Sequence, residues 1–227
     1  MAFDAIDLEL PGARVRFTTR AGGVSEGPYA SLNLGRWTDD DPAAVEENRR
    51  RAADGAPIAF ARQVHGTDVI ALDGAPPADR IADADGVVTR AHGVAAMVLT
   101  ADCVPVALAA PDAVAMVHAG WKGLSGGVLE AGVAALRTDG PIHAAIGPAA
   151  GACCYEVGPE VAERFPDWAL NGRLLDLKAV AASRLRAAGV ADVLDVHRCT
   201  MCEPDVFFSH RASGPVTGRQ GGLAWRS

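Results

Sequence analysis

The sequence predicts an α/β protein of the α+β type, in which mixed β-sheets are flanked by helices in one domain spanning residues 1–227. Apolar, strand-like runs follow one another in the middle of the chain and alternate with helical segments later. No G-x-G-x-x-G follows a first strand and no Walker A sequence occurs, which argues against a doubly wound nucleotide-binding fold. The hydrophobic share of 49% is that of a globular protein with a substantial core.

The first half of the chain supplies one helix and most of the strands. Alternating residues predict a strand over 15–19, and Asp41 is a plausible N-cap for a helix over 42–54. Runs rich in Val, Met and Leu predict four neighbouring strands, over 86–89, 95–100, 104–109 and 113–118.

The second half alternates between helices and strands. Residues 124–137 carry apolar side chains at helical spacing, with Leu124, Val128, Val133 and Leu136 as core positions. Two further helices are expected over 159–164 and 177–188, the second ended by Gly189. Short strands are expected over 141–146, 193–197 and 206–209.

Charge and composition narrow the class of partner. A net charge of −7 argues against nucleic acid and anionic membrane, which both bind clustered Lys and Arg. The apolar stretch 94–110 is interrupted by Asp102 and Pro105 and is too short to span a bilayer. The N-terminus lacks the pattern of a signal peptide, and five cysteines form no tidy disulfide framework. We therefore expect a cytoplasmic protein with reduced thiols, and a monomer by default.

A predicted hairpin brings two chemically active residues together. Pro111 and Asp112 are turn residues between two apolar runs, so facing residues should have numbers that sum to about 223. The residue numbers of Cys103 and His118 come close to that sum, so these two residues should lie almost opposite each other. His65 comes from elsewhere in the chain, and its position stays open.

One Cys and two His suit Zn²⁺ and leave a fourth coordination position free, as in catalytic sites. Copper accepts the same donors. Two metal-free interpretations stay open on these spacings: a buried Cys103 beside hydrogen-bonded histidines, and a Cys–His nucleophile pair.

Glycine-rich loops and further cysteines give weaker signals. Residues 120–127 lead from a strand into a helix and, with Lys122, suit an anion, although a tight turn explains them equally well. The vicinal pair Cys153 and Cys154 does not match a zinc ribbon. Cys199 and Cys202 form a lone C-x-x-C, whereas zinc sites of that type need a second pair. No role is assigned to these four cysteines.

Ordered motifs cover nearly the whole chain: TTRAGGVSEGPYASLNLG (18–35), QVHGTDV (63–69), ADGVVT (84–89), TADCVPV (100–106), VHAGWKG (117–123), IGPAAGACCYEVGPEV (146–161), LDLKA (175–179), CT (199–200) and FFSHRASGPVTGRQGGLAW (207–225). Together they resemble the multicopper polyphenol oxidase (laccase)-like family, now regarded as zinc-dependent purine nucleoside phosphorylases and adenosine deaminases. The resemblance implies that His65, Cys103 and His118 are the metal ligands. It also implies a fold similar to the catalytic domain of cytotoxic necrotizing factor toxins.

The implied reaction is phosphorolysis of adenosine, inosine, guanosine and methylthioadenosine, with adenosine deamination as a second activity. Six histidines are too few for a multicopper oxidase, so zinc is expected, and copper oxidation of phenols would be a side reaction. The H-x-E and P-C-x-x-C signature of other zinc deaminases is absent from the sequence.

Phosphorolysis needs a phosphate cradle and stabilisation of the departing base. Cys103 and His118 are the expected catalytic residues, and Asp102 is expected to move a proton. The substrate contacts are expected from Arg20, Lys122 and Arg211 for phosphate, and Asn33 and Gln63 for the purine.

Plain structural roles compete with several of these assignments. The two arginines Arg20 and Arg211 would serve equally as ion-pair partners, Asn33 as a turn residue, and Asp102 as a strand-end cap. The other histidines, His92, His143, His197 and His210, match no ligand motif and are interpreted as surface or core residues. Two competing functions are a metal-free hydrolase or deamidase, with Cys103 as nucleophile and His118 as base, and a non-enzymatic binding protein.

Overall fold

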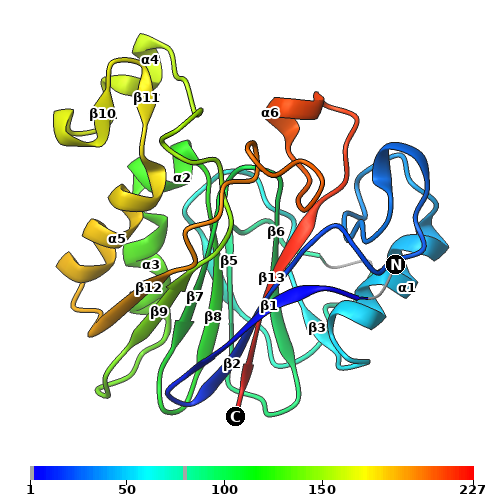
Figure 1. Ribbon diagram of the computed structural model, residues 1–227. Helices are drawn as coiled ribbons and strands as arrows, with labels where there is room; N and C mark the ends of the chain where they lie inside the picture. The colour runs from blue at the N-terminus through cyan, green and yellow to red at the C-terminus, as the bar shows by residue number, and fades with distance from the viewer. Residues whose placement is uncertain (1–2, 79–80) are drawn as a thin grey trace.

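In a computed structural model, which describes residues 3–78 and 81–227, helices and two β-sheets stack in four layers (Figure 1). The predicted α+β class, with mixed sheets flanked by helices, is confirmed. The predicted extent of 1–227 includes residues 1–2 and 79–80, which lie outside the described residues. No helix within the described ranges is both long and apolar enough to cross a membrane.

The first sheet has five strands and joins the two ends of the chain. Its order is β1 (Ala5–Leu10), β2 (Ala13–Thr18), β13 (Gln220–Arg226), β6 (Ala95–Thr100) and β3 (Ile58–Ala59). All pairs are antiparallel except β3 with β6. The C-terminal strand is therefore the centre of this sheet.

The second sheet has six strands and is mixed. Its order is β12 (Asp192–Asp195), β9 (His143–Ile146), β7 (Val104–Ala109), β8 (Val114–Ala119), β5 (Gly86–Thr89) and β4 (Val69–Ala71). The outer pairs β12–β9 and β4–β5 are parallel, and the inner pairs are antiparallel. A small hairpin, β10 (Leu170–Asn171) with β11 (Leu174–Leu175), stands apart.

Alternation along the strands separates the core into layers. On β7, Ala107 and Ala109 face the first sheet, whereas Val106 and Leu108 face the helices on the other side. Those helices are α2 (Trp121–Gly126), α3 (Val128–Ala135) and α5 (Leu177–Ala187). On the far side of the molecule α1 (Pro42–Ala52) covers the five-stranded sheet (Figure 1). The short helices are Gly27–Tyr29, α4 (Pro159–Ala162), Asp167–Ala169 and α6 (His210–Ser213).

The central hairpin has the predicted register. Pro105 pairs with His118 and Val106 with Val117, so the numbers of facing residues sum to 223. The N-cap prediction is also confirmed, because the Asp41 side chain accepts the N–H of Ala43 at 3.0 Å. Local turn and capping chemistry therefore positions these elements correctly.

Two predictions are wrong. The single helix expected over 124–137 is two helices, because Gly127 adopts a left-handed φ of 100° and breaks the helix. Residues 206–209 form turns and an irregular segment before α6, although Phe207 and Phe208 are buried. Strands β1 and β13 and the short strands β3, β4, β10 and β11 were not predicted.

Candidate active site

Three loops or strand ends bring together the side chains that were predicted to bind a metal. His118 is near the end of β8 and is buried, Cys103 directly precedes β7, and His65 lies on an exposed loop between β3 and β4. Their ligand atoms all lie within 4.8 Å of one another. The Cys103 Sγ to His65 Nε2 distance is 3.9 Å, and the two imidazole rings meet edge to face.

Asp85 organises this cluster, and sequence reasoning missed it. Its fully buried carboxylate accepts the backbone N–H groups of Val64, His65 and Gly66, at 3.1, 2.9 and 2.6 Å. It also accepts Nδ1–H of His118 at 2.8 Å. One side chain thus fixes both the His65 loop and the His118 ring. The ADGVVT motif contained this residue, but nothing in the local pattern pointed to the contacts.

The electrostatics favour an ionised thiol beside a charged imidazole. Burial opposes ionisation of Cys103, but the charge and hydrogen bonds of His118, with those of His65, lower its pKa to about 6. Burial likewise opposes protonation of His118, but the Cys103 thiolate and Asp85 raise its pKa to about 9. Burial also disfavours the Asp85 carboxylate, yet the His118 and backbone hydrogen bonds hold its pKa below the usual value.

The donor set fits zinc. The Nδ1 of His118 is committed to Asp85, which leaves Nε2 as the ligand atom, and a carboxylate holding the other ring nitrogen is typical of metal-binding histidines. Gly120 leaves space for the donors, because a Cβ there would lie 2.9 Å from His65 Cδ2 and 3.2 Å from Cys103 Sγ. Two histidines and one cysteine leave a fourth coordination position for a pocket ligand.

The three donors open onto a cavity of about 370 Å³, within the size range of small-molecule sites. Its walls come from seven separate segments of the chain. The lining residues are Gly35, Trp37, Thr38, Gln63, His65, Leu99, Thr100, Ala101, Asp102, Cys103, His118, Tyr155, His210, Arg211 and Arg219.

Two of the predicted substrate residues line this cavity. Gln63 does so with its amide paired to the backbone of Leu99, through two hydrogen bonds of 2.7 Å. Arg211 donates to the carbonyl oxygen of Glu156 at 2.8 Å, and its guanidinium lies over the Tyr155 ring.

Three other predicted residues lie outside the lining. Asn33 is fully buried, and its amide donates to the side chains of Thr38 and Asp40. Arg20 donates to the carbonyl oxygens of Ala30 and Pro204. Lys122 is exposed in a separate hollow with Trp121, Ser125, Gly126 and Arg164.

Asp102 lies in the lining with both carboxylate oxygens engaged. Oδ1 accepts the Thr200 hydroxyl and Oδ2 accepts the Arg211 backbone N–H, each at 2.7 Å. Its backbone has a positive φ of 97°. This residue therefore ties the chain before Cys103 to two distant loops.

The pocket also contains cationic and aromatic residues that were not predicted. Arg219 and His210 both come from the FFSHRASGPVTGRQGG motif, and His210 lines the pocket although it was interpreted only as a surface or core residue. The Arg219 guanidinium donates to the carbonyl oxygens of Thr217 and Gly218, and burial lowers its pKa. Trp37 is 54% exposed at the rim.

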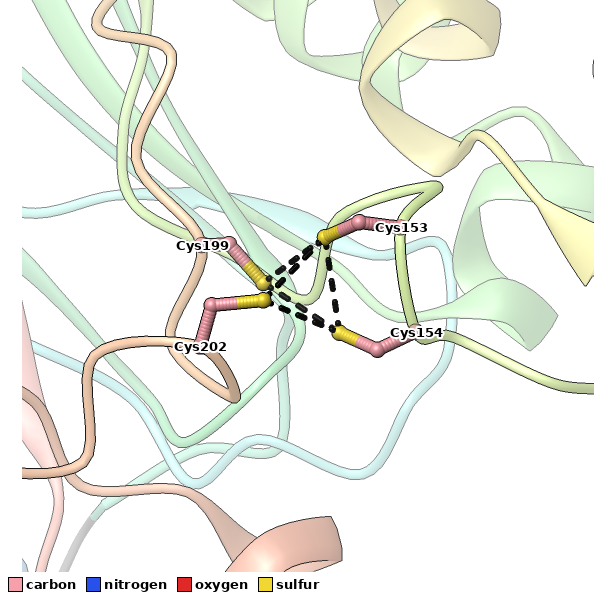
Figure 2. Close-up of side chains that lie close together, drawn as sticks. All are labelled: Cys153, Cys154, Cys199 and Cys202. Atoms are coloured by element: carbon pink, nitrogen blue, oxygen red, sulfur yellow. Dashed lines mark hydrogen bonds between the residues drawn. The ribbon is translucent and has the colours of Figure 1, made fainter.

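A second group of possible metal ligands lies on other loops. The sulfur atoms of Cys153, Cys154, Cys199 and Cys202, which we call the cysteine cluster, all lie within 4.8 Å of one another (Figure 2). The expectation that the Cys199–Cys202 pair lacks a partner pair is wrong. The parallel pairing of β9 with β12 brings the vicinal cysteines to it.

Comparisons with known proteins show the family to which the chain belongs. Residues 14–227 match the family described as multi-copper polyphenol oxidoreductase laccase. A purine nucleoside phosphorylase of Corynebacterium glutamicum is 39% identical, with 98% of each chain covered. Purine nucleoside phosphorylase YfiH of Escherichia coli is 41% identical over 92% of this chain and 91% of its own.

Solved structures show the same fold. A protein of Neisseria meningitidis superposes with a TM-score of 0.87 at 38% identity, over 100% of both chains. YlmD from Geobacillus stearothermophilus gives a TM-score of 0.86 at 35% identity, over 95% of this chain and 92% of that chain. The chain therefore belongs to the laccase-like family described as multi-copper polyphenol oxidoreductases, several of whose members are named purine nucleoside phosphorylases.

Proposed function

We propose that the protein is a zinc-dependent purine nucleoside phosphorylase that acts on adenosine, inosine, guanosine or methylthioadenosine. The observation that carries this proposal is the convergence of His65, Cys103 and His118 on one pocket that also contains Arg211 and Arg219. The relatives named purine nucleoside phosphorylase support the reaction class.

The reaction sets clear demands on the pocket. A phosphate oxygen bonds to C1′ of the ribose as the bond from C1′ to the purine nitrogen breaks. The base leaves with the bonding electrons and takes up a proton, and ribose 1-phosphate remains. Positive charge builds on the sugar and negative charge on the base, so the site must hold an anion and stabilise a leaving group.

Arg211 and Arg219 are suited to hold the phosphate. Both line the pocket, and backbone carbonyl oxygens fix the direction of each guanidinium. Arginine presents donors in a planar fork that matches phosphate oxygens. In this proposal Arg20 holds a surrounding loop through the carbonyl oxygens of Ala30 and Pro204, and Lys122 takes no part in binding phosphate, because neither lines the cavity.

The purine has a suitable wall at Trp37, whose exposed ring offers a stacking surface, with Gln63 deeper in the pocket. Asn33 acts indirectly, by fixing the neighbouring loop through Thr38 and Asp40. Zinc bound by His65, Cys103 and His118 supplies Lewis acidity beside these residues.

Asp102 was expected to transfer a proton. Since both of its oxygens already accept hydrogen bonds, we assign it a positioning role. It orients the segment before Cys103, and it orients the first turn of α6, which contains Arg211. In this proposal Cys103 and His118 contribute to the reaction as zinc ligands, and Asp85 positions them.

A metal-free thiol enzyme is the second candidate, and one observation favours it. Asp85, His118 and Cys103 lie in the order orienting acid, base and nucleophile, as in a catalytic triad. Zinc content divides the two candidates: metal at this site supports the phosphorylase, and a fully active metal-free protein supports the thiol mechanism. Copper in place of zinc would support phenol oxidation as a side activity.

The test is product analysis with protein purified without a histidine tag. Adenosine and inosine are incubated with and without phosphate, and the products are separated by chromatography. The phosphorylase releases free base and ribose 1-phosphate only when phosphate is present. Conversion of adenosine to inosine without phosphate would reveal the deaminase activity, and no product under any condition would refute the enzymatic proposal.

A further inference from the structure

We infer that the protein has a second zinc site, structural rather than catalytic, formed by the four cysteines Cys153, Cys154, Cys199 and Cys202. This inference does not depend on the proposed function. It begins with the topology: β9 and β12 are parallel neighbours, so the segments that follow them leave the same edge of the sheet. The bridge between Ala149 and Cys199 continues that pairing into the two loops.

The spacing of the sulfur atoms matches a tetrahedral metal site. Cys153 lies 3.6 Å from Cys154 and Cys199 and 3.3 Å from Cys202, measured between sulfurs (Figure 2). The Cys154 sulfur lies 3.4 Å from that of Cys199 and 3.6 Å from that of Cys202. Four Zn–S bonds of about 2.3 Å at tetrahedral angles place sulfurs roughly 3.8 Å apart. A disulfide would bring two of them to about 2.05 Å, and all four are free thiols.

The backbone around the cluster is fitted to it. The N–H of Gly151 donates to the Cys199 sulfur at 3.3 Å, and turn hydrogen bonds from Cys154 and Tyr155 to the Gly151 carbonyl curl the loop under the sulfurs. A Cβ at Gly151 would lie 3.2 Å from the Cys153 sulfur and 3.3 Å from that of Cys199. Donors to ligand sulfurs and close glycines of this kind orient metal ligands.

The ligand chemistry suits a structural zinc site. Four thiolates in a tetrahedron suit Zn²⁺ or iron, and four protein ligands leave no open position for substrate. A zinc ion with four thiolates carries a net negative charge. The hollow beside Cys153 and Cys199 is lined by the cationic side chains of Lys178, Arg186 and Arg198 and by the carboxylates of Asp176 and Asp195, so cations exceed anions there by one.

The position of this site explains what it does. The cluster clamps together two loops that both reach Asp102: the N–H of Ala150 donates to its carbonyl oxygen at 2.9 Å, and the Thr200 hydroxyl donates to its carboxylate. Tyr155, the residue after Cys154, lines the cavity. The cysteine cluster therefore acts as a positioning device for the wall of the active site next to Cys103.

The direct test is the metal content of the full-length, untagged protein. We expect two zinc ions per chain in the wild type. Cys202→Ser should retain about one, since one ligand of the structural site is lost and the other site is intact. Cys202→His should retain about two, because three cysteines with one histidine also hold structural zinc. His65→Ala should lose the other ion and keep the ion of the cysteine cluster.

Other results would overturn the inference. One zinc per wild-type chain that disappears in His65→Ala would show that the cluster binds none. Iron in place of zinc would contradict the metal assignment. Fewer than five free thiols in denatured, chelator-treated protein would show that the cysteines form disulfides instead. Because the wild-type count and the thiol count need no variant, poor folding of Cys202→Ser leaves the test intact.

Discussion

The two groups of metal-ligating side chains differ in what surrounds them. His65, Cys103 and His118 offer three donors at the wall of a cavity, whereas the cysteine cluster offers four donors between two loops. An incomplete donor set beside a cavity is suited to substrate chemistry, and a complete set is suited to holding the chain. In the roles proposed here, the first group takes part in the reaction and the second supports the chain around it.

Asp102 connects the two groups. Its chain neighbour Cys103 belongs to the first, and its hydrogen bonds with Ala150 and Thr200 lead to the loops of the second. The loops of the cysteine cluster are therefore tied to the residue next to Cys103. A substitution in either group should remove the zinc ion of that group alone, so the zinc content should distinguish the two groups even where both substitutions lower the activity.

Among the variants that keep Cys103, the largest effect is expected from His65→Ala, which removes an exposed ligand. We expect base release from inosine to fall by more than about 100-fold, because removing a ligand should cost at least as much as losing an outer-shell partner. Release is measured by chromatography at saturating phosphate. His197→Ala is the matched control, since His197 is also exposed and also has a positive φ. Equal losses in both variants would refute the assignment of His65.

Asp85→Asn should weaken the first metal site by about 10- to 100-fold, because the amide cannot accept all of the hydrogen bonds that hold His118 and the His65 loop. Competition with a chelator measures the affinity, and the zinc of the cysteine cluster should stay. Asp83→Asn is the control, because Asp83 is an exposed carboxylate paired with Arg62. Unchanged affinity in Asp85→Asn would show that the carboxylate does not position the ligands.

Arg219→Ala should raise the KM for phosphate about tenfold, since one charge-assisted contact is lost. Lys122→Ala should leave that KM within about twofold, because Lys122 lies in a separate hollow. Initial rates at varied phosphate and fixed inosine decide between them. A larger effect for Lys122→Ala would place the phosphate elsewhere.

The smallest effects are expected from adding one methyl group beside each group of ligands. Gly120→Ala would crowd His65 and Cys103, and Gly151→Ala would crowd Cys153 and Cys199. Neither glycine has a positive φ, so any effect is steric. We expect each variant to bind one of its two zinc ions severalfold more weakly, on the order of tenfold at most. Loss of the same ion in both variants would contradict the separation of the two sites.

Local chemistry explains what could be predicted from the sequence. The Pro111–Asp112 turn gave the correct register for the central hairpin, and hence the proximity of Cys103 and His118. Capping by Asp41 and termination at Gly189 depend only on neighbouring residues. The ordered family motifs, rather than local geometry, supplied His65.

Long-range pairing explains what was missed. The role of Asp85 depends on contacts across about 20 and 33 residues, which no local pattern encodes. The two cysteine pairs meet only because β9 and β12, which are separated in the sequence by helix α5 among other elements, are parallel neighbours in the sheet. Strand β13 contains two adjacent glycines and reads poorly as a strand, yet it is the centre of its sheet.

The most direct test of the central claim measures zinc content and inosine phosphorolysis on the same sample of Cys103→Ala. The account predicts that this variant keeps the one zinc ion of the cysteine cluster and releases no hypoxanthine above background, with or without phosphate. Turnover equal to that of the wild type would contradict the assignment of the His65, Cys103 and His118 centre as the active site.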